Sequence, residues 1–181
     1  MTATEIIAQV ISVFAMTVNI LSYQCKTQRG IITSQFFGSI LFATSFLMLG
    51  TLMGALTNGI GILRAFVYRN RERFHADHIL WMIGFITLFA LSYVVSFTLL
   101  GTEPTTRNLI LELLPVLAMS VSTVSFRMKN ARAIRYLGLI SSPAWLVYNI
   151  CAFSIGAILC EAISLVSILV GILRFDLPRR R

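Results

Sequence analysis

Two long stretches with almost no charge constrain the fold of this chain more than any other feature. The 34 residues from Gly30 to Leu63 contain no charged side chain, and the stretch from Tyr136 to Leu173 contains only Glu161. An apolar helix needs ~20 residues to cross the ~30 Å hydrocarbon core of a bilayer, so each stretch is too long for one crossing and fits two. Soluble domains carry about 25% charged residues, whereas this chain carries 12% and is 57% hydrophobic. The missing polar surface predicts an all-α, polytopic membrane protein.

The sequence predicts seven transmembrane helices in a single membrane domain, residues 1–181. Gly50 and Gly54 allow the first stretch to turn at 50–54, and the second is expected to turn at 153–156. Pro115 falls inside the fifth helix, where neighbouring helices can satisfy the carbonyl that proline frees. The expected spans cover 5–23, 31–49, 55–68, 79–100, 108–126 and two helices within 136–173.

The Lys and Arg residues predict the orientation of these helices. With the N-terminus outside, fourteen of the fifteen cations fall on the cytoplasmic side, Arg64 and the last three arginines among them, and only Arg107 lies outside. An excess of Lys and Arg in short loops marks the cytoplasmic side of a membrane protein. The first charged residue is Glu5 rather than a cation, which argues against a cleaved signal peptide. We therefore expect the N-terminus outside and the C-terminus in the cytoplasm.

Two parts of the chain resemble each other. Residues 15–29 align with 118–132 at a shift of 103, and six of the fifteen positions are identical. Both segments end in Ser-aromatic-x-x-Lys-x-x-Arg, and the sequence Gly-Ile-Leu-Arg recurs at 61–64 and 171–174. The pattern predicts a 3+1+3 arrangement, with two parallel triple-helix repeats (5–68 and 108–174) joined by a linker span (79–100). Parallel repeats of this kind recur in transporters, with the substrate site near the midplane between the halves.

Several short motifs resemble known families. With the 3+1+3 plan, three motifs resemble the SWEET and SemiSWEET (PQ-loop) sugar transporters: Ser22-Tyr23-Gln24-Cys25-Lys26, Asn58-x-x-Gly61 and Trp145-x-x-Tyr148. Tyr23 stands where the PQ motif has proline. A closer resemblance, over nearly the whole length, is to the YgjV family of bacterial inner-membrane proteins, and it rests on Leu113-Leu114-Pro115-Val116, Val121-Ser122-Thr123, Trp145 with Asn149, Ser154-Ile155-Gly156, Glu161 and Arg174-Phe175. The first resemblance implies a transporter fold, and the second implies location in the inner membrane.

Polar side chains inside the expected spans are candidates for solute contact, because such residues are costly in lipid and need a partner or a purpose. Trp145 and Asn149 are four residues apart and share a helix face, where an aromatic ring and an amide suit a small polar solute. Glu161 could hold a proton, pair with a cation or face a cavity. The predicted substrate-binding residues are Asn19, Asn58, Ser122, Trp145, Asn149 and Glu161. The alternative for Asn19, Asn58 and Ser122 is an interhelical hydrogen bond, typically worth ~0.6 kcal/mol. The alternative is packing within the bundle for Trp145, and a carboxylate that extends to the outer face for Glu161.

No catalytic centre, cofactor or metal site is expected. The chain has no HExxH, GxSxG or glycine-rich phosphate motif, and the group His75, Asp77 and His78 is a weak match to a metal site. The three cysteines are read as apolar helix residues, although an oxidising outer face would allow a Cys151–Cys160 bridge. The cations separate apolar runs rather than forming a patch for nucleic acid. We expect a SWEET-like transporter or binder of a small polar solute or, alternatively, a non-transporting membrane protein with a structural or interaction role; the lipid bilayer is a partner in both cases.

Overall fold

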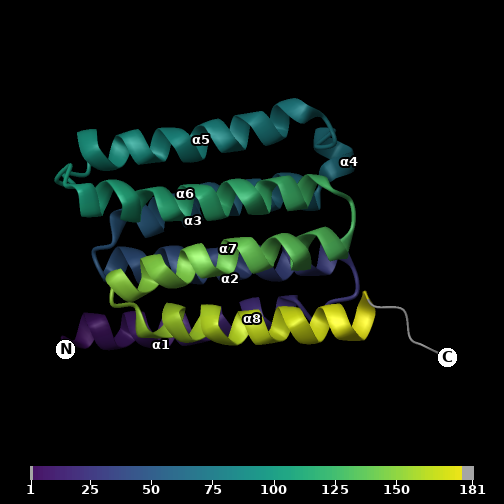
Figure 1. The fold of residues 1–181 in the computed structure, drawn as a ribbon, viewed down its shortest axis with the longest axis horizontal. Coiled ribbons are helices and arrows are strands. Elements are labelled where there is room, and N and C mark those ends of the chain that lie inside the picture. The colour runs from purple at the N-terminus through teal and green to yellow at the C-terminus, as the bar shows by residue number, and fades with distance from the viewer. Residues whose placement is uncertain (1, 177–181) are drawn as a thin grey trace.

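The computed structural model describes residues 2–176, which form eight helices and no strand (Figure 1). The all-helical class is thereby confirmed. The last three arginines, counted above among the cytoplasmic cations, lie outside the described residues. The helices are α1 (Ala3–Ser22), α2 (Gln28–Met48), α3 (Leu52–Arg69), α4 (Arg71–Phe74), α5 (Ile79–Thr98), α6 (Thr106–Arg127), α7 (Ala131–Cys151) and α8 (Ile155–Phe175).

The outer surface of the bundle is apolar. Large side chains such as Phe14, Leu80 and Val166 are 64%, 66% and 60% exposed, which suits lipid rather than water. By length and composition, five of the described helices could cross a membrane, namely α1, α2, α5, α6 and α8. The two other long helices, α3 and α7, carry buried polar residues, Asn58 and Arg64 on the first and Asn149 on the second.

Short polar caps set where the helices begin. The Thr27 hydroxyl accepts a hydrogen bond from the Gly30 amide at the start of α2, and Thr105 does the same for Asn108 at the start of α6. Side-chain acceptors at this position satisfy amides that have no partner within the helix. The α2–α3 turn falls at residues 49–51, at the start of the expected interval, because Gly50 adopts a φ of 72°.

One element was not expected from the sequence. The segment between the third and fourth predicted spans contains α4, a single helical turn, rather than only a loop. It ends at His75, whose left-handed conformation (φ 49°) stops the helix. The turn at 153–156 lies slightly earlier than expected, at 152–154, with Phe153 in the left-handed region.

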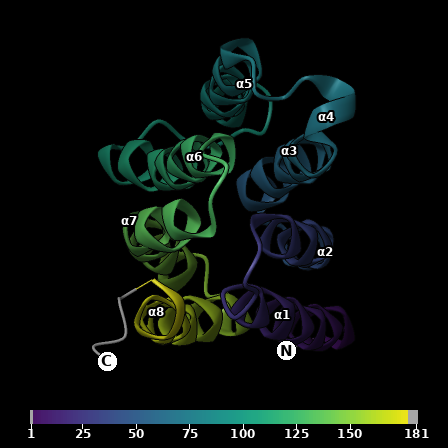
Figure 2. The same ribbon diagram turned by 90° about the vertical axis from the view of Figure 1, so that its right-hand side faces the viewer.

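Six of the seven long helices form a closed ring, and the seventh, α5, lies outside it. Figure 2 shows α1, α2 and α3 side by side, which we call the first triplet, facing α8, α7 and α6, the second triplet. The triplets touch at both edges, α1 against α8 and α3 against α6, while α5 packs on α3 and α6. The N-terminus and the end of α8 lie at opposite ends of the bundle (Figure 1).

The contact between α1 and α8 depends on a glycine. A Cβ atom at Gly156 would lie 3.1 Å from the backbone carbonyl carbon of Ser12 and closer still to its side chain. We expect Gly156→Ala to lower the free energy of unfolding by about 1–3 kcal/mol, because the two helices must move apart. Thermal unfolding of the purified protein in detergent measures the change. The control is Gly59→Ala, where a Cβ meets nothing within 4 Å and where alanine should stabilise the helix by about 0.5–1 kcal/mol. Equal effects of the two substitutions would contradict the close contact.

Candidate functional site

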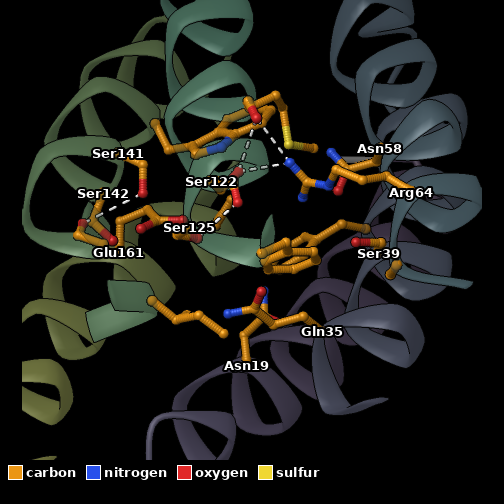
Figure 3. A pocket seen from close by; sticks show the side chains of 18 of the residues that line it. Asn19, Gln35, Ser39, Asn58, Arg64, Ser122, Ser125, Ser141, Ser142 and Glu161 are labelled. Atoms are coloured by element: carbon orange, nitrogen blue, oxygen red, sulfur yellow. Dashed lines mark hydrogen bonds between the residues drawn. The ribbon is translucent and has the colours of Figure 1, made fainter. Parts of the chain in front are cut away.

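A polar cavity lies between the two triplets (Figure 3). Its volume is about 90 Å³, which is room for a few water molecules, each occupying ~30 Å³ in the liquid, or for one small solute. The structure brings all six predicted site residues to its wall: Asn19, Asn58, Ser122, Trp145, Asn149 and Glu161. That these residues bind a solute stays a prediction.

The three asparagines at the cavity differ in their bonding. The Asn58 amide donates to the Gly54 carbonyl of its own helix at 2.9 Å, so it already has a local partner. The side-chain oxygens of Asn19 and Asn149 have no hydrogen-bond partner among the described residues. Asn149 is only 2% exposed. A buried polar atom without a partner is costly, so these two oxygens mark where a donor is missing.

Aromatic packing fixes the tryptophan at the cavity wall. The Trp145 ring stacks on Phe46 with 6.4 Å between centroids, and meets Tyr148 edge-on at 5.7 Å. Phe46 in turn stacks on Phe42. The tryptophan therefore packs in the bundle and also lines the cavity. Packing within the bundle and contact with a solute, the two interpretations drawn from the sequence, are thus compatible.

Arg64 is a site residue that the sequence analysis missed. It was counted among the cytoplasmic cations, but its side chain lines the cavity and is only 4% exposed. Its Nη1 atom donates to the Met119 carbonyl at 2.8 Å, to the Ser122 hydroxyl at 2.7 Å and to the Thr123 hydroxyl at 3.0 Å. Spacing could have revealed it, because Asn58, Gly61 and Arg64 are three residues apart and share a helix face.

The guanidinium group of Arg64 has no counter-ion in the described part of the chain. Its central carbon lies 4.5 Å from the centre of the Phe126 ring and 5.5 Å from that of Phe89, so two aromatic faces take the place of a carboxylate. Among the described residues no acidic group lies within 4.0 Å of it, and its Nε atom has no partner. A buried cation in this state is costly.

Glu161 faces the same cavity from the second triplet. It extends from α8 and is partly exposed within the cavity wall. Figure 3 shows Glu161 and Arg64 entering from opposite sides. No ion pair of 4.0 Å or less joins Glu161 to a cation in the part of the chain that the structure describes.

The remaining candidates from the sequence lie apart from the cavity. Asp77 pairs with Lys129 and with Arg71 in the loops at one end of the bundle, and the hydrogen bond from Lys129 holds the pKa of the Asp77 carboxyl below its ordinary value. Within residues 2–176, no three His, Cys, Asp or Glu side chains are grouped to hold a metal ion. The three cysteines are free thiols, so no Cys151–Cys160 bridge is formed.

The apolar exterior and the long helices define a multi-pass helical membrane protein. A family model described as bacterial inner membrane protein (Imp-YgjV) matches residues 6–179, and the chain belongs to this family. The resemblance inferred from the sequence is thus confirmed for this family, which supports location in the bacterial inner membrane. No curated protein and no solved structure matches the chain. The resemblance to the SWEET transporters stays a prediction.

Proposed function

We propose that this protein binds a small polar solute in the cavity between its triplets and carries it across the inner membrane. The observation behind this proposal is the cavity itself, which is lined by polar groups from both triplets inside a bundle whose exterior is apolar. Solute sites of transporters built from two repeats lie between the halves in the same way. The resemblance to SWEET transporters points to the same role.

The proposal includes seven membrane spans in a 3+1+3 arrangement. Helices α3 and α7 have 18 and 21 residues, which corresponds to ~27 and ~32 Å at ~1.5 Å per residue, enough to span the hydrocarbon core. Their lower hydropathy follows from residues that face the cavity, such as Asn58, Arg64 and Asn149. The contact of α1 with α8 is equivalent to that of α6 with α3, as expected if α1, α2 and α3 correspond to α6, α7 and α8.

The topology makes a direct prediction. With the N-terminus outside and the C-terminus in the cytoplasm, a fluorescent protein that matures only in the cytoplasm should be bright when fused to the C-terminus. Alkaline phosphatase, which is active only outside the cytoplasm, should be inactive at the same position. Cell fluorescence and phosphatase assays measure the two fusions. A dark first fusion with an active second one would overturn the orientation and the odd number of spans.

The proposed activity predicts solute-specific binding. In a panel of small sugars, polyols, amino acids and organic acids, at least one solute should raise the melting temperature and enter proteoliposomes that contain the protein. Asn149→Ala should weaken its binding about 5- to 10-fold, because a buried hydrogen bond typically contributes about 1 kcal/mol. The matched control Asn70→Ala changes an asparagine outside the cavity and should leave binding unchanged. Isothermal titration calorimetry in nanodiscs provides the dissociation constants.

A non-transporting structural or interaction role is the alternative. It is favoured by the bonding of Asn58 within its own helix and by the stacking of Trp145 on Phe46, since both side chains have structural partners. Under this alternative no solute in the panel binds, and Asn149→Ala changes only the stability. That combination would overturn the transport proposal.

A further inference from the structure

The cavity contains one positive and one negative side chain that do not neutralise each other. Arg64 belongs to the first triplet and Glu161 to the second, and the two enter from opposite sides (Figure 3). Salt bridges within 4.0 Å are absent for both among residues 2–176. We propose that the solute is a small zwitterion, with a carboxylate bound by Arg64 and an ammonium group facing Glu161. This inference rests on the proposed function and names its substrate class.

The free edge of Arg64 fits a carboxylate. All three of its hydrogen bonds come from Nη1, which leaves the edge formed by Nε and Nη2 without a bond in the described structure. Two adjacent N–H groups in one plane match the two oxygens of a carboxylate, and such bidentate pairs are among the stronger hydrogen bonds in proteins. The bonds to Met119, Ser122 and Thr123 hold the guanidinium in place before any solute arrives.

The cavity wall also offers acceptors for an ammonium group. An ammonium donates three hydrogen bonds and accepts none. Glu161 supplies a carboxylate, and the unpartnered side-chain oxygens of Asn19 and Asn149 line the same cavity. The unsatisfied groups are thus one cationic donor and two neutral acceptors, which together with Glu161 complement a molecule that carries both charges.

The two charges also disfavour other classes of solute. A neutral polyol would leave both charges without a counter-charge in a low-dielectric site. A simple anion would be repelled by Glu161, and a simple cation by Arg64, since unfavourable charge contacts are a general source of specificity. The cavity of about 90 Å³ suits a solute of the size of an amino acid with a short side chain.

The test begins with the wild-type protein in nanodiscs and four probes of similar size. Alanine carries both charges, lactate has a hydroxyl in place of the ammonium, ethylamine lacks the carboxylate, and glycerol is neutral. We expect alanine to bind about 10- to 100-fold more tightly than each of the others in titration calorimetry, since hydrogen bonds to charged groups are worth about that factor. Tighter or equal binding of glycerol or lactate would overturn the zwitterion while leaving solute binding intact. The absence of binding by these probes and by the wider panel would overturn both proposals.

Variants connect each charge to its end of the solute. Arg64→Met should weaken alanine binding about 10- to 100-fold, whereas Arg174→Met should not, because that arginine is exposed and lies outside the cavity. Glu161→Gln should weaken the binding of alanine. It should also reduce the ratio of the affinities for alanine and lactate, because the carboxylate that repels the lactate anion is gone. Glu103→Gln, at an exposed position, is the matched control.

The variants remain informative if one of them folds poorly. Arg64→Lys keeps the charge but loses the planar pair of donors, so it should bind alanine with intermediate affinity. Size-exclusion profiles identify variants that do not fold, and the wild-type comparison of the four probes stands without any variant. Unchanged alanine binding in folded Arg64→Met or in folded Glu161→Gln would overturn the assignment.

Discussion

Replacing Asp176 with asparagine is expected to lower the free energy of unfolding by about 3–5 kcal/mol, because it removes the only counter-charge that a buried arginine has among residues 2–176. Arg135 and Asp176 are 1% and 7% exposed, and Nη1 of the arginine lies 2.8 Å from the aspartate. Arg135 also donates to the carbonyls of Tyr23 and Cys25. A single side chain therefore joins the start of α7 to the ends of α1 and α8 and to the loop between α1 and α2.

Thermal and denaturant unfolding of the detergent-solubilised protein measures this loss. The control is Arg132→Met, since Arg132 lies 3.7 Å from the same carboxylate but its side chain is 65% exposed, and exposed pairs contribute about 0–1 kcal/mol. The double variant Arg135→Met with Asp176→Leu should recover much of the stability, because apolar residues can replace a buried ion pair at little cost. A loss no larger for Asp176→Asn than for Arg132→Met would show that the pair is not buried in the folded protein.

The second large effect has the opposite sign. Arg64→Met is expected to raise the free energy of unfolding by about 1–2 kcal/mol in the absence of solute, because a buried cation without an anionic partner is replaced by an apolar side chain. Removal of Arg64 leaves neither hydroxyl without a hydrogen bond, because Ser122 and Thr123 both donate to the Met119 carbonyl. The loss of two contacts with aromatic rings, Phe89 and Phe126, reduces the gain without reversing it.

Melting temperatures of Arg64→Met and of Arg174→Met, its control with the same change in charge, measure this gain. A gain in stability combined with a loss of solute binding is typical of a functional group that is kept at a cost to the fold. If Arg64→Met instead destabilised the protein as strongly as Asp176→Asn, the main role of Arg64 would be to stabilise the contact between α3 and α6. Its proposed role in solute binding would then lose its support.

The sequence predicted the class of the fold and which residues line the cavity. It predicted less well which of those residues are buried and which hydrogen bonds they make. Long uncharged runs place helices and turns reliably, because the bilayer fixes the length of each apolar segment. The six predicted residues lie around one cavity, since polar groups in such helices avoid lipid and gather inside.

Arg64 was misplaced for a physical reason. The rule that cations mark the cytoplasmic side treats every arginine near a helix end alike, and Arg64 is five residues from the end of α3. The spacing along α3 can place Arg64 on the face of Asn58, but it does not identify the acceptors on α6 that bind the guanidinium. The same limit applies to Asn58, whose bond to Gly54 within its own helix depends on a side-chain rotamer.

The hydrogen bonds between Arg64 and α6 also have a consequence for how the protein is made. The arginine and its acceptor Met119 are 55 residues apart in the chain, and at ~5–20 residues per second the ribosome needs about 3–11 s to make the intervening segment. During that interval the arginine has none of its final hydrogen-bond partners, and an arginine without them is unfavourable in hydrocarbon. We therefore expect α3 to enter the bilayer late, held at the insertion machinery or at the membrane surface until α6 emerges. Assembly of the cavity would then follow the order of translation, because α3 of the first triplet would be inserted only after α6 of the second triplet has been made.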